Sequence, residues 1–589
     1  MSAAGRSSAL VTRLRCYLNW ETGAYAVVSV MALAMRLWDL GARGVSHDES
    51  LHGIYSWYLA NGSGYSHDPM MHGPFLFHGT ALNFVIFGDS DVTLRLLAAL
   101  LGTGLVVLPY FLRRHLGRRG ALCVAALLAF SPTLLYFSRY TRNDVIMAFW
   151  ALLLVVLLWR YFGEKRSRYL YMGAAVLSFA FCTKETSYIT TAAFVLILLV
   201  VAARELLKRV RRGFGLKGLS PQAEYALLIG TLSLPLYSAF VQLIPNVDLP
   251  SGFHWVKMLT VAVLLGVCAA IGIRWDWRRW LLSALVFYGI FALLYTSFFT
   301  TPAGFVSGLW GSVDYWIEQQ SVARGGQPWF YYFMILPVYE FLPLVFAAAG
   351  AFYYAVKGRL YSRFLIDWGL ISLLAYTYSG EKMPWISVHM ALPVILLGGM
   401  FIGRLWCGFG WRSFSAWALR GVTVAAVLLL FSFSLHVAMQ ASYDRSDDTP
   451  EMLVYAGVSY DVPAAVAEIE RISKQTGEGK DMHIGVDSPF TWPWYWYLRD
   501  YRHVGYSSLA VIDETPNARV LVVETGHLSA IEPYLDSYEE GPSFRDLLWF
   551  PEEYRDFDLG WWWRYFLNRS TDGPYWSTEG VVYYRVAAP

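Results

Sequence analysis

The segment from Ser46 to His72, SHDESLHGIYSWYLANGSGYSHDPMMH, gathers acidic and histidine side chains directly after an apolar run. The tripeptide Ser-His-Asp occurs in it twice, at 46–48 and at 66–68. Carboxylates and imidazoles transfer protons and bind metals, so such a cluster predicts a reaction or a binding site. The preceding residues, AYAVVSVMALAMRLWDLGARGV, are almost long enough to cross a bilayer. We therefore expect the cluster to lie at a membrane surface.

The start of this segment has the pattern of a capped helix. Ser46 and Glu49 have the spacing of a capping box, in which Glu49 bonds back to the cap amide. A catalytic role for Glu49 is the alternative, and the sequence leaves both open. Asp48 has no part in the box. It shares a helix face with His52, on a helix expected to end near Asn61, and it suits a general base or a metal ligand.

A metal site is a second interpretation of the same region. The second Ser-His-Asp segment supplies four more side chains of the required kinds: His67, Asp68, His72 and His78. Together with Asp48 or Glu49 they leave room for a divalent metal, although neither HExxH nor CxxC spacing is present. The ordinary alternative is a surface loop in which Pro69 and Gly73-Pro74 fix turns. No cofactor and no defined metal ligand set are therefore predicted.

The elements that position these residues are membrane helices. The chain has 589 residues, of which 56% are hydrophobic and only 15% are charged, with a mean hydropathy of +0.39. This composition indicates a polytopic membrane protein, with membrane lipids as partners and no nucleic-acid partner. Thirteen apolar runs are candidate crossings: 22–40, 92–112, 120–138, 144–162, 169–182, 186–203, 223–244, 256–273, 280–298, 330–356, 364–378, 385–403 and 416–436.

Charge in the short loops predicts the orientation of these crossings. Five alternate loops are basic, at 113–119, 164–168, 204–212, 274–279 and 357–363, and cationic loops stay in the cytoplasm. The N-terminus is then cytoplasmic, and the loops at 41–91, 138–144, 183–187, 245–255, 299–329 and 379–385 face outward. The tail from Ala441, with 25 acidic and 12 basic residues, is placed outside the cytoplasm as well. The expected location is the plasma membrane.

Several short motifs on the predicted outer face resemble those of the GT-C glycosyltransferases. They are HDE at 47–49, HDPMMHGPFLF at 67–77, SRYTRNDV at 138–145, Thr183-Lys184, and EKMPWISVHMALP at 381–393. Within that superfamily the sequence is most similar to the group of dolichyl-phosphate-mannose–protein mannosyltransferases and lipid A aminoarabinose transferases. More narrowly, it resembles the flippase-activity-associated glycosylation proteins. The likeness extends over about residues 20 to 436.

The resemblance implies transfer of a sugar from a polyprenyl-phosphate carrier to a protein, lipid or glycan acceptor outside the cytoplasm, with inversion. It implies three catalytic candidates: Asp48 as base, its neighbour Glu49, and Asp144 to orient the acceptor or assist the base. Cations for the carrier phosphate would be Arg139, Arg142, Lys184 and Lys382. The remaining substrate-binding candidates on this face are His47, His52, His72 and Glu185. Met383-Pro384-Trp385 departs from the family, whose members often have Lys or Arg followed by Tyr in this motif.

Two further elements complete the predicted architecture. Residues 308–329 predict a short amphipathic helix around Val313 to Gln320 with a break at Gly325-Gly326, which is either a lid or a structural surface helix. The fold class is thus an α-helical polytopic membrane protein, GT-C-like with about 13 transmembrane helices, followed by an extracytoplasmic α/β domain. Its expected domains are a catalytic transmembrane domain at 1–440, including the loop at 41–91, and the soluble domain at 441–589.

The tail alternates one helical segment, DVPAAVAEIERISKQTG, with strand-like DMHIGVDS, ARVLVVETG and EGVVYYRVA. Its aromatic runs at 491–501 and 561–566 favour core packing over stacking on sugar or membrane contact. For the function, the alternatives to a transferase are a polyprenyl-lipid transporter or flippase, and a non-catalytic subunit of a glycosylation assembly. A transporter predicts broken helices in paired positions and an internal repeat, and neither is clear in the sequence.

Overall fold

The computed structural model describes residues 19–211, 215–244, 255–322, 324–408, 414–446, 451–511, 517–556, 558–573 and 576–585. The chain divides into two compact units. The helical unit comprises Met1–Trp38, Ser66–Leu76 and Ala98–Ala438, and the mixed unit comprises Asp39–Tyr65, Phe77–Leu97 and Met439–Pro589. Most of the loop at 41–91 therefore belongs to the same unit as the tail.

Helices occupy the predicted membrane spans. Within the described residues, seven segments are long and apolar enough to cross a membrane: Asp91–Leu116, Asn143–Glu164, Thr186–Arg209, Pro221–Leu243, Trp255–Tyr295, Pro384–Trp406 and Arg420–Asp444. Two bent pairs raise the count to nine: α7 (Arg118–Phe130) with α8 (Pro132–Ser138), and α16 (Tyr331–Tyr339) with α17 (Phe341–Lys357). Helices α2 (Trp20–Leu37), α10 (Arg168–Phe181) and α18 (Leu360–Tyr378) coincide with predicted spans but do not meet the same length and hydropathy. The chain is a multi-pass membrane protein, and the count of thirteen crossings is not confirmed.

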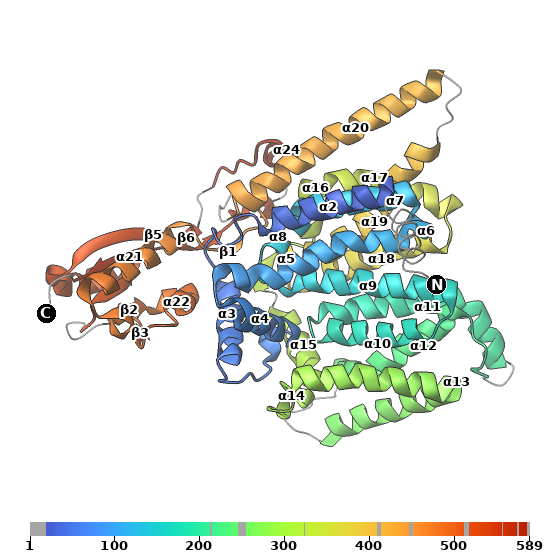
Figure 1. Ribbon diagram of the computed structural model, residues 1–589, viewed down its shortest axis with the longest axis horizontal. Coiled ribbons are helices and arrows are strands. Elements are labelled where there is room, and N and C mark those ends of the chain that lie inside the picture. Colours follow the sequence, from blue (N-terminus) through green and yellow to red (C-terminus); the bar gives the residue numbers. More distant parts are fainter. Residues whose placement is uncertain are drawn as a thin grey trace, which may run out of the picture. The chain divides into compact units, whose positions relative to one another are not determined.

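Helix α13 (Trp255–Tyr295) accounts for two of the predicted spans. Its 41 residues would extend about 60 Å as one helix, which is twice the ~30 Å of a hydrocarbon core. Asp276 interrupts it with φ −156° and ψ 98°, and the ribbon turns back near this residue (Figure 1). Gly272 permits the reversal, because a Cβ there would lie 2.2 Å from the Trp280 ring. The interruption falls within the turn predicted at 274–279.

The bend between α7 and α8 is produced by Pro132, whose ring cannot continue the hydrogen bonding of α7. The buried side chain of Arg36, from α2, donates to the carbonyl oxygens of Leu128 and Ala129 near the end of α7. Ser131 caps α8 through its Oγ, which accepts from the amide of Leu134. The bend is thus stabilised by satisfied polar groups and fixes the chain that leads into the next helix.

Helix α9 (Asn143–Glu164) runs through the core of the helical unit and is buried along most of its length. It packs against α10, and in Figure 1 it also lies close to α5 (Asp91–Val107) and α18. Asp144 lies in its first turn and Gly163 in its last, and the rise over the 19 steps from one to the other is about 28 Å. The two ends of α9 therefore define the two ends of the helical unit.

The tail forms a six-stranded mixed sheet with the order β1-β5-β6-β4-β2-β3. The strands are β1 (Tyr455–Gly457), β2 (His483–Asp487), β3 (His503–Ser507), β4 (Val520–Glu524), β5 (Glu539–Trp549) and β6 (Trp576–Tyr584). Strand β2 is parallel to β3 and β4, and the other pairs are antiparallel. The amphipathic helix α21 (Asp461–Thr476) buries its apolar face in a core shared with the strands. The predicted helix and three strands are confirmed.

The aromatic run at 491–501 lies mainly in the core of the mixed unit. Helix α22 (Thr491–Tyr497) carries Trp494 and Trp496, which are both fully buried. The indole of Trp496 donates to Asp91 Oδ1 at 2.8 Å, and Arg499 pairs with Asp89 at 2.9 Å. The preference for core packing is therefore confirmed for these two tryptophans.

Candidate functional site

The first candidate group begins at helix α3 (His47–Ala60), in the mixed unit. Ser46 Oγ accepts from the amide of Glu49 at 3.4 Å, and Glu49 Oε2 accepts from the amide of Ser46 at 3.3 Å. The predicted capping box is therefore present, and the helix ends at the predicted Asn61. Asp48 is half-buried in the first turn, beside the half-buried His47. Its carboxylate is attached to a helix start that is fixed by the cap.

Glu49 is held by two arginines in addition to the cap. Arg95 Nε lies 2.8 Å from Glu49 Oε1, Arg95 Nη2 lies 2.9 Å from Oε2, and Arg43 Nη2 lies 3.2 Å from Oε2. The Glu49 side chain has no exposed surface. Arg95 also donates to the carbonyls of Leu40, Arg43 and Gly44. Through these contacts Glu49 connects the loop before α3 to the start of α5, which is a structural role.

His52 is buried, and its Nδ1 donates to the backbone carbonyl of Asp48 at 2.6 Å. Its ring lies against Phe77, with the centroids 5.5 Å apart. The predicted side-by-side placement of His52 and Asp48 is therefore correct, but the described bond involves the Asp48 backbone. In this position His52 stabilises the first turn of α3.

The second candidate group lies at the start of α9, in the helical unit. Asp144 is fully buried and accepts from Lys184 Nζ at 2.9 and 2.8 Å, through its two oxygens. His389, on α19 (Ser387–Gly408), donates from Nε2 to Asp144 Oδ1 at 3.0 Å. The ring of Tyr376, on α18, stacks on His389 with the centroids 5.6 Å apart. The structure thus brings together Asp144 and Lys184, which were predicted from motifs 40 residues apart.

Arg142 precedes α9 and lies flat over the Trp385 ring, with 3.5 Å from the guanidinium carbon to the ring centroid. A cation held over an indole face is stabilised by about 0.5–2 kcal/mol, more when water is excluded. Trp385 is one of the three residues that depart from the family motif. This difference from the family motif therefore gives Arg142 an aromatic ring to pack on, beside the Asp144 group.

The other two predicted phosphate-binding cations are engaged by backbone. Arg139 Nη1 donates to the carbonyls of Met35, Arg36 and Trp38 at the end of α2. Lys382 is buried, its Nζ donates to the Ser379 carbonyl at 2.7 Å, and burial lowers its pKa. These contacts fit the capping of helix ends, which is the structural alternative for a cation at such a position.

The third group surrounds His72. Its Nδ1 lies 2.7 Å from Glu185 Oε2, and its ring stacks on Trp316 with the centroids 5.0 Å apart and the planes at 8°. Gly73 places His72 there: its amide donates to the Thr183 carbonyl, and any Cβ would lie 2.2 Å from the Cys182 carbonyl oxygen. The segment after the second Ser-His-Asp therefore lies directly on the Thr183-Lys184 turn.

Burial sets the charge of two groups in this region. It raises the pKa of Glu185 to about 7, although Lys184 acts in the opposite direction. It lowers the pKa of His67 to about 4, and the neutral His67 ring bonds through Nδ1 to Ser307 Oγ at 2.8 Å. Glu185 therefore titrates near neutral pH, whereas His67 is uncharged there.

A cavity of about 340 Å³ lies beside these groups, within the helical unit. Its charged and polar lining includes Lys184, Glu185, His72 and Glu381. Apolar side chains line much of the rest: Ile189, Phe240, Leu243, Val313, Ile317 and Ile386. Helix α15 (Ser312–Val322) forms one wall through Val313, Trp316 and Ile317. The predicted short helix in the loop at 299–329 is confirmed, and it covers the cavity.

The metal hypothesis gains no ligand set around α3. In the portions of the chain that the structure describes, the group of three metal-ligating side chains within reach of one ion is Asp487, Glu524 and His527, in the tail sheet. Asp487 there already accepts from the amides of Leu509 and Glu524 and from His527. His78 packs edge-on against Tyr65, and Asp68 caps a short turn by accepting from the Met70 amide.

Sequence reasoning missed four residues of these groups: Arg95, Trp316, Tyr376 and His389. His389 was inside a quoted motif, and a histidine in an apolar run was the available signal. The other three, Arg95, Trp316 and Tyr376, have no local signal, because their roles depend on partners distant in sequence. Such distances are also seen for His389 and Asp144, which are 245 positions apart.

Comparison with known proteins bears on the fold. Residues 71–216 match the family model of dolichyl-phosphate-mannose-protein mannosyltransferase. No curated protein sequence matches the chain at a significant level. The oligosaccharyltransferase of Archaeoglobus fulgidus, tethered with an acceptor peptide, is similar over 91% of this chain and 75% of its own, with 12% identity and a TM-score of 0.53.

ArnT from Cupriavidus metallidurans, bound to undecaprenyl phosphate, is similar over 88% of this chain and 96% of its own, with 13% identity and a TM-score of 0.52. The apo form of the Archaeoglobus enzyme is similar over 87% of this chain and 71% of its own, with 13% identity and a TM-score of 0.52. These matches confirm the resemblance seen in the motifs. The chain has the fold of the GT-C membrane glycosyltransferases.

Proposed function

We propose that the protein transfers a sugar from a polyprenyl-phosphate carrier to an acceptor on the extracytoplasmic face of the plasma membrane, with inversion at the anomeric carbon. The observation that carries the proposal is that Lys184, which is bonded to the buried Asp144–His389 pair, lines a largely apolar cavity. A lipid phosphate needs this combination, with cations for its head and an apolar wall for its chain. The similar ArnT structure is bound to undecaprenyl phosphate, which supports the same carrier class here.

We assign the binding of the carrier phosphate to Lys184 and Arg142. Asp144 takes up one positive charge and, together with His389, fixes the position of the Lys184 ammonium. Arg142 adds a second positive charge, so the group attracts an anion. Cations placed where negative charge develops on the leaving phosphate lower the barrier to breaking the sugar–phosphate bond. We assign Arg139 and Lys382 to holding helix ends, because their described donors bind backbone carbonyls.

The general base is assigned to Asp48. In a single displacement the acceptor forms a bond to the anomeric carbon as the bond to the phosphate oxygen breaks, and a carboxylate takes the acceptor's proton. Glu49 is occupied by Arg95 and Arg43 and is assigned a structural role.

Helix α15 and the His72–Glu185 pair are assigned to the sugar and the acceptor. Trp316 contributes an aromatic face next to the cavity, and His72 and Glu185 contribute hydrogen-bonding groups. A short helix at the wall of a site can open for the carrier and close over the reacting groups. Closure would keep water from competing with the acceptor.

The test is transfer from a panel of polyprenyl-phosphate sugars by the purified protein. Asp48→Asn should reduce transfer by about 10²–10⁴-fold, because it removes a general base at nearly constant size. Asp68→Asn is the matched control from the second Ser-His-Asp, and it should transfer like wild type. Carrier binding should be unchanged in Asp48→Asn and should weaken roughly tenfold or more in Lys184→Met.

Full activity of Asp48→Asn would assign the base elsewhere and contradict the mechanism. Movement of the carrier lipid between leaflets without cleavage by the wild-type protein would contradict the transferase assignment as a whole. Thermal unfolding of each variant separates these outcomes from a failure to fold.

A further inference from the structure

A second cavity, of about 710 Å³, lies in the helical unit at the end of the bundle opposite Asp144. Trp159, Phe162 and Gly163 of the last turns of α9 line it, so it is separated from Asp144 by nearly the length of that helix. Its other walls come from α6 (Arg113–Leu116), α7, α17, α18 and α19. None of the transfer chemistry described above uses this cavity.

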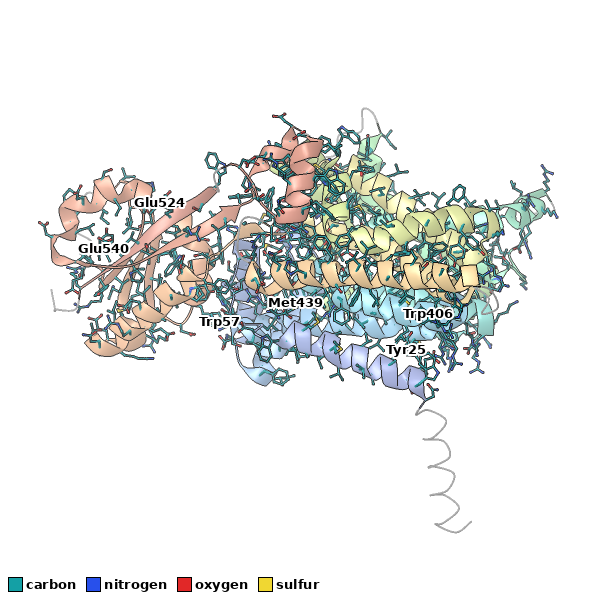
Figure 2. The ribbon with its side chains drawn as sticks, turned by 90° about the horizontal axis from the view of Figure 1, so that it is seen from above. Tyr25, Trp57, Trp406, Met439, Glu524 and Glu540 are labelled. Carbon is teal, nitrogen blue, oxygen red and sulfur yellow. The ribbon has the colours of Figure 1, made fainter. Side chains whose placement is uncertain are left out.

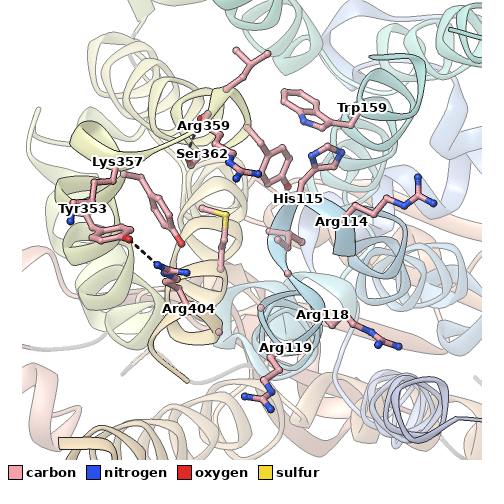
Figure 3. A pocket seen from close by; sticks show the side chains of 18 of the residues that line it. Arg114, His115, Arg118, Arg119, Trp159, Tyr353, Lys357, Arg359, Ser362 and Arg404 are labelled. Carbon is pink, nitrogen blue, oxygen red and sulfur yellow. Dashed lines mark hydrogen bonds between the residues drawn. The ribbon is translucent and has the colours of Figure 1, made fainter. Parts of the chain in front are cut away.

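The lining of this cavity is strongly cationic. Among the described residues, those that line it include six arginines and lysines and no acidic one: Arg114, Arg118, Arg119, Lys357, Arg359 and Arg404. Figure 3 shows Arg359 and Arg404 on the same side of the cavity as Lys357, with Arg404 directed toward Tyr353 and Arg114 across from them. The cavity therefore concentrates positive charge from three separate parts of the sequence, 114–119, 357–359 and 404.

Four of these six cations have no acidic partner within the described residues. Arg118 pairs with Glu21 at 2.6 Å. Over the described ranges, no carboxylate oxygen lies within 4 Å of the cationic nitrogens of Arg114, Lys357, Arg359 or Arg404. Arg404 donates to the hydroxyl of Tyr353 at 3.3 Å, a neutral partner. Like charges held together in this way repel each other, and a bound anion removes the repulsion.

Two helix N-termini at the cavity also favour a bound anion. Helix α7 begins after Gly117 and helix α18 begins after Arg359, and neither has a side-chain cap hydrogen bond. The first amides of such helices present donors and a partial positive charge, which favours an anion. The helix ends and the cation cluster are independent features that select the same kind of ligand.

The surface beside the cavity is apolar. Phe352 and Val356 on α17 are 83% and 75% exposed, and Trp406 on α19 is 54% exposed (Figure 2). Exposed side chains of this kind on a membrane helix contact acyl chains. The predicted topology places the loops at 113–119 and 357–363 in the cytoplasm, where the inner leaflet supplies anionic headgroups. A ligand with a phosphate head and an apolar chain matches both surfaces.

We propose that this cavity binds a phosphate group, with the headgroup of an anionic lipid in the adjacent leaflet as its source. Arginines hold phosphate by paired hydrogen bonds from the planar guanidinium, so Arg359 and Arg404 are the principal contacts. The site is separate from the transfer site and does not depend on which sugar is transferred.

The test measures binding to the full-length protein in nanodiscs of phosphatidylcholine. One arm titrates phosphatidic acid into the bilayer, and the other adds inorganic phosphate to the buffer. The variant is Arg359→Gln with Arg404→Gln. Its matched control is Arg166→Gln with Arg363→Gln, which removes the same charge from the same predicted face but not from the cavity lining. The double variant should bind phosphatidic acid at least about tenfold more weakly than the control.

Weaker binding of phosphatidic acid by the double variant than by its control supports the lipid headgroup as the source of the phosphate. A phosphate arm that alone responds to the substitutions supports the phosphate site and overturns its assignment to lipid. Equal binding by variant and control in both arms overturns the proposal. If the double variant does not fold, Arg359→Lys with Arg404→Lys replaces it. This variant keeps the charge but removes the paired guanidinium donors, and it should show an intermediate loss of binding.

Discussion

At the scale of single residues, Asp48 and Glu49 show how adjacent carboxylates acquire different roles. They are neighbours in sequence and both lie in the first turn of α3. Glu49 points to two arginines and to the cap amide, and has no exposed surface. Asp48 is half-buried and lies outside the cap. The capping box fixes the side of the helix that each carboxylate faces, and it directs Glu49, not Asp48, into the buried ion pair with Arg95.

Glu185 gives a prediction for pH dependence. Its pKa in the folded protein is about 7, above its ordinary value of 4.5, because burial disfavours the charged form. The stabilisation from the neutral group is therefore complete below about pH 4.5 and is lost as the pH rises through 7. Wild-type thermal stability should fall between pH 5 and about 8, and Glu185→Gln should remove part of this fall.

The matched control is Glu318→Gln, an exposed glutamate on α15. It should retain the wild-type profile. Identical profiles for Glu185→Gln and wild type, from thermal unfolding in detergent across this range, would show that Glu185 is ionised throughout.

At the scale of secondary-structure elements, the Glu49–Arg95 pair links the start of α3 to α5. A buried ion pair loses about 3–5 kcal/mol of stability when one partner is removed, because the other charge stays buried without compensation. Arg95→Leu should therefore destabilise the protein strongly, and Glu49→Leu with Arg95→Leu should recover part of the loss. Chemical unfolding of the three proteins measures this difference.

Arg471→Leu is the comparison, because Arg471 pairs with Glu468 at the surface of α21 and should change stability little. An Arg95→Leu protein as stable as the Arg471→Leu protein would mean that the buried pair does not hold the loop before α3.

Elements with local signals were predictable from the sequence. The capping box at Ser46, the interruption near Asp276 and the strands of the tail each depend on residues a few positions apart, so the sequence contains their cause. The partners of Asp144 and Arg142 were only half predicted. Lys184 was inferred through resemblance, but His389 and Trp385 meet these residues because α19 packs in the same helical unit, and no short-range pattern encodes that packing.

At the scale of the whole molecule, composition was enough to establish a multi-pass membrane protein, but not its number of crossings. Several helices are short, bent or polar enough to lie near the limit of a span. The association of residues 39–65 and 77–97 with the tail was not predicted, because alternation of loops assigns a side of the membrane and says nothing about which domain a loop joins.

The predicted topology can be tested with single cysteines in a protein lacking its five native ones. Arg166→Cys, in the basic loop at 164–168, should be protected from a membrane-impermeant thiol reagent in intact cells. Glu540→Cys, on the exposed edge of β5 (Figure 2), should be labelled. Permeabilised cells provide the control in which both react. Equal labelling of the two sites in intact cells would contradict the orientation.

The mixed unit is built from the two ends of the chain, and this has a consequence for synthesis. Tyr497 accepts from the Val45 amide across 452 positions, and Trp496 reaches Asp91 across 405. At about 5–20 residues per second, α3 waits roughly 20–90 s on the ribosome before these partners exist. Helix α3 therefore acquires its contacts with α22 only after residues 491–497 have been made, so a polypeptide that is truncated before them keeps the cap at Ser46 but lacks these contacts around Asp48.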